Sequence, residues 1–175
     1  MKMNIIALAL GMGMAAFSGA SVAADVTPTT DSTHVHFIGS ITNAPCSMTK
    51  DSLEQKVPMG SIAAHVLVNG GTSDAVPFHF DLTDCPVGSS VAVTFGGASD
   101  SADVKLLALG SGKASGAGIQ ILADGKPVTL GMATTQQNLS EGDNTLTFSA
   151  QLKGDNATVN PGDFDAVSDV TFTYQ

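Results

Sequence analysis

The sequence predicts an all-β protein with the architecture of a sandwich or barrel. Short apolar or alternating runs recur along the 175 residues, and Gly, Pro, Asn, Asp and Ser separate them. Short runs with turn residues between them are typical of β-sandwiches and barrels. No stretch outside the N-terminal segment has sustained helical periodicity. The chain length fits one domain.

The chain begins with a segment that is typical of a secretory signal peptide. Lys2 precedes an apolar run over residues 5–17, and small residues follow over residues 18–24. This order of charged, apolar and small residues is the pattern of a cleaved signal. The apolar run is also shorter than the ~20 residues that span a bilayer. We therefore expect residues 1–23 to be a signal peptide that is removed after Ala23.

Residues 24–34 differ in composition from the rest of the chain. They are rich in Thr and Asp, contain Pro28, and have no bulky apolar residue after Val26. Terminal segments of this kind are extended and mobile unless another element holds them. We expect an extended segment here.

Nine runs are predicted to form strands. They span residues 35–41, 62–68, 76–82, 90–95, 104–109, 118–122, 127–130, 145–152 and 166–174. Asp124-Gly125 between two of them is a favourable sequence for a type I′ hairpin turn, and residues 141–144 mark another turn. One short helical turn is expected over residues 50–55.

The C-terminal residues alternate in polarity. The mainly apolar parity comprises Phe164, Ala166, Ser168, Val170, Phe172 and Tyr174, whereas the other parity is mostly polar. This pattern predicts a strand with one buried face and one face in solvent.

The charge of the chain excludes several classes of partner. The formal net charge is -9, and all seven basic residues are Lys. Removal of residues 1–23 takes away one Lys and no acid, which leaves 6 - 16 = -10. Nucleic acids and acidic membranes attract positive surfaces and favour Arg, so neither is an expected partner. No second apolar run approaches membrane length, so no membrane insertion is expected after processing.

The two cysteines, Cys46 and Cys85, are predicted to form a disulfide. Exported proteins enter an oxidising compartment in which paired cysteines are usually bonded. The bond would close a loop of about 40 residues and contribute roughly 4 kcal/mol to stability.

No catalytic or metal site is predicted. Four histidines, His34, His36, His65 and His79, are too few for the dinuclear site of copper-zinc superoxide dismutase, another secreted β-sandwich with a disulfide. The chain has no GxSxG nucleophile motif. Its Gly-rich residues 110–118 lack the Lys-Ser/Thr of a phosphate-binding loop and are expected to form a flexible connection between strands. We expect a protein that is not an enzyme and has no cofactor.

Four short sequence motifs, in their order along the chain, resemble those of the structural pilins of the chaperone-usher pathway. These pilins form the rods of type 1 and P pili of Gram-negative bacteria. The motifs are VHFIG at residues 35–39, NAPCS at 43–47, FDLTDC at 80–85, and VTFTYQ at 170–175 with its penultimate Tyr174. The resemblance implies an incomplete immunoglobulin-like sandwich that lacks its final strand. Such a domain has an open apolar groove and an unpaired sheet edge.

The resemblance also implies how the subunit assembles. A periplasmic chaperone would occupy the groove first, and at the outer-membrane usher the N-terminal extension of the next identical or related subunit would replace it. This exchange is β-augmentation in its donor-strand form. Because each subunit donates at one place and accepts at another, the contact generates an open filament.

On this resemblance, residues 24–34 are the donor strand and residues 35–175 are the pilin domain. The donor residues are Val26, Pro28, Thr30, Ser32 and His34. The strand at the edge of the groove, which the chaperone would contact, carries Phe164, Ala166, Val170, Phe172 and Tyr174.

We therefore expect a structural fimbrial subunit that is exported through the periplasm and assembled on the cell surface. The alternative is a minor adaptor, tip or terminator subunit of the same pilus. A carbohydrate-binding adhesin is less well supported, because it usually needs a second domain and this chain has no Trp to stack on sugars.

Overall fold

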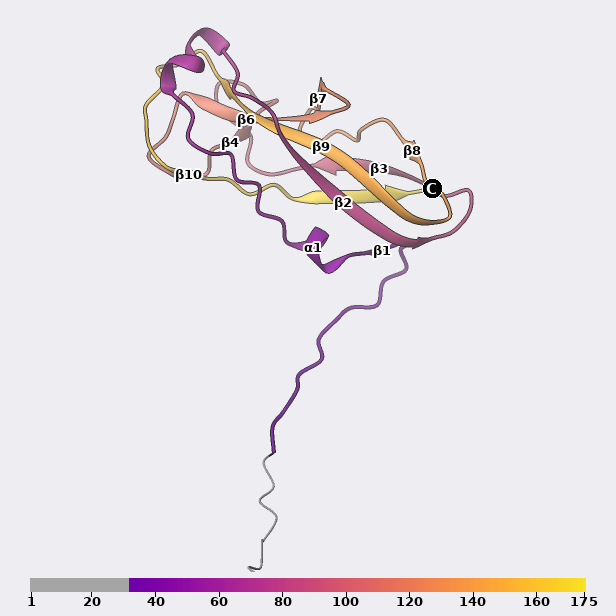
Figure 1. Ribbon diagram of the computed structural model, residues 1–175. Coiled ribbons are helices and arrows are strands. Elements are labelled where there is room, and N and C mark those ends of the chain that lie inside the picture. Colours follow the sequence, from indigo (N-terminus) through magenta and orange to yellow (C-terminus); the bar gives the residue numbers. More distant parts are fainter. Residues whose placement is uncertain (1–31) are drawn as a thin grey trace, which may run out of the picture. The chain divides into compact units, whose positions relative to one another are not determined.

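The computed structural model describes residues 32–175 (Figure 1). The expected signal peptide and the predicted donor residues Val26, Pro28 and Thr30 lie outside the described residues. Residues 32–40 belong to a different unit from residues 41–175 and have no regular secondary structure. All helices and strands of the described chain lie in the second unit.

A six-stranded antiparallel sheet forms the larger layer of this unit. Its order is β1-β2-β9-β6-β4, and β7 also pairs with β6. The strands are β1 (Ser47–Met48), β2 (Val76–Cys85), β4 (Leu107–Ala108), β6 (Ala117–Ala123), β7 (Lys126–Pro127) and β9 (Gly142–Gly154). The long strands β2 and β9 lie side by side in Figure 1 and pair from Val76 with Ala150 to Cys85 with Gly142.

Two smaller sheets and three short helices complete the unit. One sheet has the order β11-β3-β8, with β3 (Ser90–Phe95), β8 (Gln137–Asn138) and β11 (Val170–Tyr174), and the other pairs β5 (Ser111–Gly112) with β10 (Phe164–Asp165). The helices are α1 (Lys50–Leu53), η1 (Ala64–Val66) and η2 (Val68–Gly70). The predicted helical turn is therefore present as α1.

Aromatic side chains join the two larger sheets. Phe95 of β3 packs edge-on against Phe148 of β9, with ring centroids 5.0 Å apart. Both side chains are almost completely buried. This packing between two sheets confirms the predicted all-β sandwich.

The central strands lie where the sequence predicts them, and so does one turn. Residues 90–95 form β3, and the other central predicted strands are present with longer bounds. Asp124 and Gly125 have φ angles of 49° and 73°, and they connect Ala123 to its pairing partner Lys126. These are the features of the predicted type I′ hairpin.

Two predicted strands are absent. Residues 62–68 contain the 3₁₀ helix η1 and the first residue of η2 in place of a strand, because only Leu67 is buried and its N–H bonds back to Ala64. Residues 35–41 form no strand either, although they include apolar side chains. No segment of the described chain pairs with residues 35–41, and a strand requires such a partner.

Other predicted strands are shorter in the structure. Pairing over 104–109 is limited to β4, because the Asp100 carboxylate accepts the N–H groups of Ala102 and Asp103 in a preceding turn. Pairing over 127–130 is limited to the first residue, in β7. The predicted turn at 141–144 lies mostly within β9.

The two ends of the predicted C-terminal strand are separate elements, since β10 pairs with β5 whereas β11 pairs with β3. The Gly-rich residues 110–118 are not a flexible connection, because they contain β5 and the beginning of β6. Within the described residues, no helix has the length and apolar character needed to cross a membrane.

Candidate binding groove

An open groove of about 1590 Å³ lies within the unit formed by residues 41–175. Its first wall is residues 52–64, and its second wall is residues 159–170 together with Phe172. Side chains of both sheets form its floor: Phe78, Phe80, Phe95, Leu107, Leu109, Ala117, Ile119, Ile121, Ala150 and Leu152. The volume exceeds the roughly 300–1,000 Å³ of small-molecule sites, so the groove can hold a segment of polypeptide.

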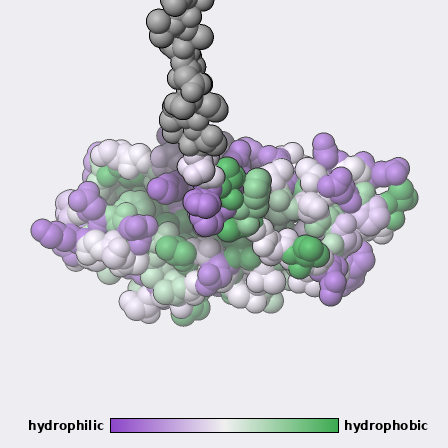
Figure 2. All heavy atoms as spheres, turned by 90° about the horizontal axis from the view of Figure 1, so that it is seen from below, coloured by the Kyte–Doolittle hydropathy of each residue, from purple (hydrophilic) through white to green (hydrophobic). Residues whose placement is uncertain are grey.

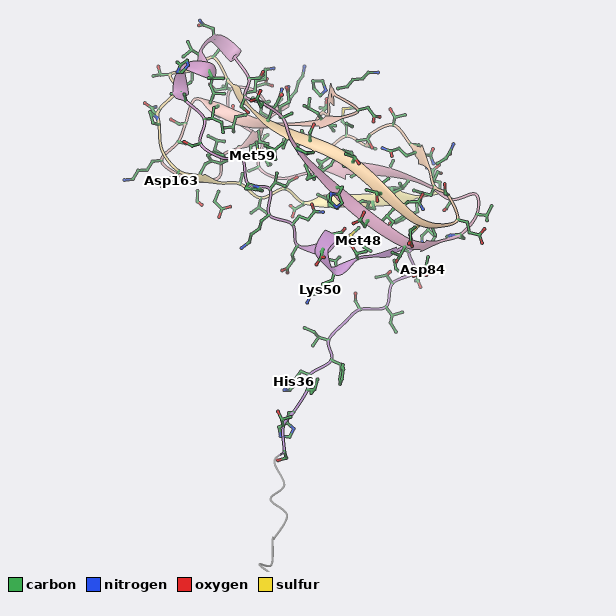
Figure 3. All side chains as sticks on the ribbon, in the orientation of Figure 1. His36, Met48, Lys50, Met59, Asp84 and Asp163 are labelled. Carbon is green, nitrogen blue, oxygen red and sulfur yellow. A yellow bond between two sulfur atoms is a disulfide. The ribbon has the colours of Figure 1, made fainter. Side chains whose placement is uncertain are left out.

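The first wall is an extended segment outside both sheets. Residues 54–63 have no regular secondary structure, and Val57, Met59 and Ile62 are half-buried toward the groove while most of their neighbours are exposed. Figure 3 labels Met59 on this wall and Asp163 on the other. Because its backbone is not paired in a sheet, this wall offers free N–H and C=O groups.

Ser52 anchors the beginning of the first wall. Its side chain is buried, and its Oγ accepts the Asp81 N–H at 2.8 Å and lies 2.9 Å from Thr49 Oγ1. These bonds tie α1 to β2. The wall therefore starts from a fixed point on the larger sheet.

The second wall contains the C-terminal strand and has the predicted alternation. Phe164, Ala166, Val170, Phe172 and Tyr174 are half-buried, and the residues between them are mainly exposed. The first four line the groove, whereas Tyr174 packs against the core without lining it. Partial burial of an apolar strand face indicates that nothing in the described chain covers it.

Strand β11 is at the edge of its sheet. It pairs with β3 from Val170 opposite Phe95 to Tyr174 opposite Val91, and no strand of the described chain lies on its other side. An unpaired edge beside an apolar groove can accept an additional strand, with main-chain hydrogen bonds at the edge and side chains in the groove.

Burial also shifts the pKa of Tyr174, the last residue of this strand. Partial burial of Tyr174 raises the pKa of its phenol above the usual 10.0, because the phenolate would lose solvation. The hydroxyl therefore remains protonated over a wider pH range than that of an exposed tyrosine.

The predicted disulfide is present. The sulfur atoms of Cys46 and Cys85 are bonded, and both residues are buried, with exposed fractions of 5% and 2%. The bond links the segment before β1 to the end of β2. It therefore holds the chain at the point where residues 41–46 enter the sandwich.

The described part of the predicted donor segment is exposed. Ser32 and His34 have no regular secondary structure. The following apolar residues, which the sequence places in the domain, are also exposed: Val35 by 68%, Phe37 by 92%, Ile38 by 97% and Ile41 by 103%. Full exposure of such large apolar side chains is unusual and typical of segments that bind a partner.

The histidines do not gather into a metal site. Among the described residues, no group of three or more potential ligands is close enough to hold a metal ion. His79 Nε2 lies 3.5 Å from Asp81 Oδ2, and Asp81 Oδ1 accepts a hydrogen bond from Thr145 Oγ1 at 2.7 Å. These side chains stand on the outer face of β2 and β9, away from the groove.

Several groove residues were not identified from the sequence. They are Val57, Met59 and Ile62 on the first wall and Phe78 and Phe80 on the floor. The apolar spacing of Val57 and Met59 is a weak signal for the wall. Phe78 and Phe80 read as ordinary core positions of a strand, and only the tertiary structure shows that both line the groove.

The face that carries α1 combines apolar and polar surface. Figure 2 views the protein from this side and shows apolar residues exposed between polar ones. Leu53 of α1 is 67% exposed. The rim of the groove is thus partly apolar as well.

Residues 35–175 match the protein family described as Fimbrial protein. Among curated proteins, the chain is 39% identical over 180 residues to the major MR/P fimbria protein of Proteus mirabilis (strain HI4320) and 42% identical over 182 residues to the fimbria A protein of Serratia marcescens. Each comparison covers 100% of both chains.

Two solved structures have the same fold. The P pilus rod subunit PapA aligns with a TM-score of 0.67 and 26% identity, over 75% of this chain and 100% of that chain. A subunit from a chaperone-usher pilus, in a structure that describes rod uncoiling, aligns with a TM-score of 0.73 and 25% identity, over 85% and 99% of the two chains. The sandwich is thus the immunoglobulin-like fold of chaperone-usher pilins.

Proposed function

This chain belongs to the fimbrial protein family and is a structural subunit of a fimbria, and from that premise we propose that its groove accepts a donor strand from a neighbouring subunit. The observation that carries the proposal is the open apolar groove beside the unpaired edge of β11. A single added strand would pair with β11 and cover the half-buried side chains of both walls.

The proposed donor strand comprises residues 24–34, as the resemblance implies, and continues to Ile41. The apolar residues Val35, Phe37 and Ile41 share one parity, and they are exposed in the structure. Gly39 has the same parity and has no atom within 4 Å of the position of a Cβ. In a strand, all four residues would face the groove of the neighbour.

Two sets of donor side chains, on opposite faces of the strand, could then occupy the groove. Val26, Pro28, Thr30, Ser32 and His34 have even numbers, whereas Val35, Phe37 and Ile41 have odd numbers. One continuous strand cannot present both sets to the same groove. An apolar groove favours the odd set, because burial of Phe or Ile contributes about 1.5–3 kcal/mol per side chain.

The length of the donor segment suits the groove. The stretch from the start of β10 at Phe164 to the end of β11 at Tyr174 spans eleven residues. The seven residues 35–41 by themselves would cover only part of it. Residues from the polar segment before Val35 are needed to cover the rest.

A subunit with an unoccupied apolar groove and an unpaired sheet edge would aggregate in the periplasm. The proposal therefore includes a periplasmic chaperone that occupies the groove before assembly, and an outer-membrane usher at which subunits exchange strands. Residues 1–23 would direct export, and the assembled fimbria would stand on the cell surface. Since the relatives include a major fimbria protein, we place the chain in the rod, with a minor adaptor, tip or terminator position as the alternative.

No enzymatic role is part of the proposal. The only ion pair among the described residues, between His79 and Asp81, lies on the exposed face of the sheet. The subunit would need neither metal nor cofactor to exchange strands, because the reaction replaces one set of hydrogen bonds and apolar contacts with another.

Electron microscopy of cells that express variants of the chain tests the donor assignment. Phe37→Asp should abolish filaments, because it places a charge in the apolar groove of the neighbour. Ile38→Asp is the matched control, because Ile38 is equally exposed and has the opposite parity. Normal filaments from Phe37→Asp would contradict the odd register.

Deletion of residues 24–34 tests how far the donor strand extends. The deletion should leave a folded subunit that accepts a strand but donates one too short to form filaments. Normal filaments from this variant would show that residues 24–34 are not part of the donor strand.

A further inference from the structure

The second wall of the groove lies at backbone contact distance from a set of glycines. We call this set, Gly96, Gly97, Gly110, Gly112 and Gly116, the glycine seam. A Cβ on Gly116 would lie 2.2 Å from the Thr158 carbonyl oxygen, and one on Gly112 would lie 2.0 Å from the Asp163 oxygen. Ordinary contacts of a Cβ are 3.4–4 Å. A side chain therefore cannot be added at Gly112 or Gly116 unless the wall moves.

The contacts follow the wall along its length. Gly116 faces residues 158–159, Gly112 faces 163–164, Gly110 faces 165–166, Gly97 faces 167–168 and Gly96 faces 169. Gly162, on the wall itself, faces Lys113 and Ala114 in return. The seam thus supports the wall from Thr158 to Asp169, the residue before β11.

Hydrogen bonds fasten the wall to this support. The Lys113 N–H donates to Asp163 O at 3.0 Å, and Ser115 and Asn160 exchange backbone bonds of 2.9 and 3.2 Å. Farther along, the Gly96 N–H donates to Asp169 O at 2.7 Å. These backbone bonds hold the wall close to the seam, and the Ser168 hydroxyl, which donates to Gly96 O at 2.8 Å, adds a side-chain bond.

The topology determines which way the wall would move. β10 and β11 pair with β5 and β3 along one edge, and within the described chain their other edge, beside the groove, is unpaired. A methyl group inserted at the seam would push the wall away from β5 and β3, and so toward the groove. At Gly116 the displacement would be roughly 1 Å, because a close-packed interior has little free space to absorb it.

We infer that the glycine seam positions the second wall so that the groove is wide enough for the large apolar side chains of a donor strand. The inference rests on the proposed function, because it assumes that the groove accepts such a strand. It adds that glycines outside the groove determine the size of side chain that the groove admits.

A graded series of alanine variants tests the inference. A Cβ on Gly96 would lie 3.6 Å from Asp169 O, an ordinary contact. On Gly97 it would lie 2.6 Å from Leu107 Cδ1, the end of a side chain, and 2.9 Å from Val167 O of the wall. The closest approach in the series is that at Gly116. Gly88→Ala is the matched control for backbone strain, because the φ of Gly88, +82°, is close to the +83° of Gly116, and no atom lies within 4 Å of an added Cβ.

The experiment measures the affinity of a fluorescent synthetic peptide of residues 24–44 for the full chain, purified as a monomer. The unfolding midpoint of each variant is measured on the same samples. Gly88→Ala and Gly96→Ala should bind as the unaltered chain does. Gly97→Ala should bind about threefold more weakly, and Gly116→Ala at least about tenfold more weakly.

A second peptide, with Phe37→Ala and Ile41→Ala, separates positioning from simple destabilisation. A narrowed groove should lose its preference for the larger side chains. The affinity for the first peptide divided by that for the second should therefore be smaller in Gly116→Ala than in the unaltered chain. Loss of stability alone would weaken both peptides equally. An unchanged ratio, or unchanged binding, would overturn the inference.

The outcomes also separate this inference from the proposed function. If the unaltered chain binds neither peptide, the donor-strand proposal itself fails. If it binds the first peptide and Gly116→Ala binds it equally well, only the seam is wrong. If Gly116→Ala does not fold, Gly97→Ala makes the same comparison with a smaller displacement, and an unchanged ratio there overturns the inference.

Discussion

The ring of Phe172 packs edge-on against the ring of Phe80, with centroids 5.1 Å apart and planes at 83°. Phe172 is on β11, the edge strand of the β11-β3-β8 sheet, and Phe80 is on β2 of the six-stranded sheet. Both side chains line the groove. This pair therefore holds the accepting edge against the core while one side of it remains open to a donor strand.

Replacement of Phe172 by Asp should lower the amount of subunit in the periplasm. The carboxylate would enter the apolar groove and disfavour capture by the chaperone, and the unprotected subunit would be degraded. Immunoblots of periplasmic fractions measure the effect. Thr173→Asp is the control, because Thr173 is on the same strand with its side chain exposed. Equal amounts of the two variants would count against the groove.

Removal of the disulfide should destabilise the subunit. Cys46→Ser combined with Cys85→Ser should lower the free energy of unfolding by about 2–5 kcal/mol, because the unfolded chain is no longer constrained. Denaturant unfolding measures the difference. Reduction of the unaltered protein should give a similar loss, and identical midpoints for oxidised protein and double variant would contradict the prediction.

The phenol of Tyr174 should titrate above pH 10.0 in the folded subunit, since burial raises its pKa. Absorbance near 295 nm reports this residue by itself, because the chain has one Tyr and no Trp. In denaturant the midpoint should return to about 10. A folded midpoint at or below the denatured one would contradict the assignment.

The same shift predicts the sign of a pH effect on stability. The folded state holds the proton more tightly than the unfolded state, so this contribution is fully present below pH 10.0 and is lost as the pH rises through the folded pKa. Tyr174→Phe should remove this part of the alkaline loss. An identical pH dependence in the variant would argue against it.

Ser52→Ala should destabilise the first wall. The buried hydroxyl accepts the Asp81 N–H, and its removal leaves that donor without its partner, at a cost of about 1–3 kcal/mol. Urea unfolding measures the change. Ser61→Ala, at an exposed position of the same wall, should have little effect, and equal losses in both variants would contradict the role of Ser52.

Features that depend on neighbouring residues were predictable. The type I′ turn at Asp124-Gly125 needs only two residues that tolerate positive φ, and both have it. The alternation from Phe164 to Tyr174 is the period of a strand, and the structure retains it across the break between β10 and β11. The disulfide followed from cysteine number and export.

Features that depend on distant partners were not predictable. Residues 35–41 and 62–68 have the apolar content of strands, yet neither pairs with another segment of the described chain. Residues 110–118 suggested a flexible loop, but close backbone contacts with the second wall hold them. The first wall, with Val57 and Met59, had no strong local signal.

The sequence by itself therefore determined the all-β class, the main strands, one hairpin and the disulfide, because side-chain period, turn conformation and cysteine pairing are encoded locally or by composition. Only the tertiary structure decided which apolar runs are paired, where the two walls enclose the groove, and that glycines hold one wall in place. Strand pairing and backbone contact join residues far apart in the chain, and the alternation of a run does not say which segment, or which molecule, will lie beside it.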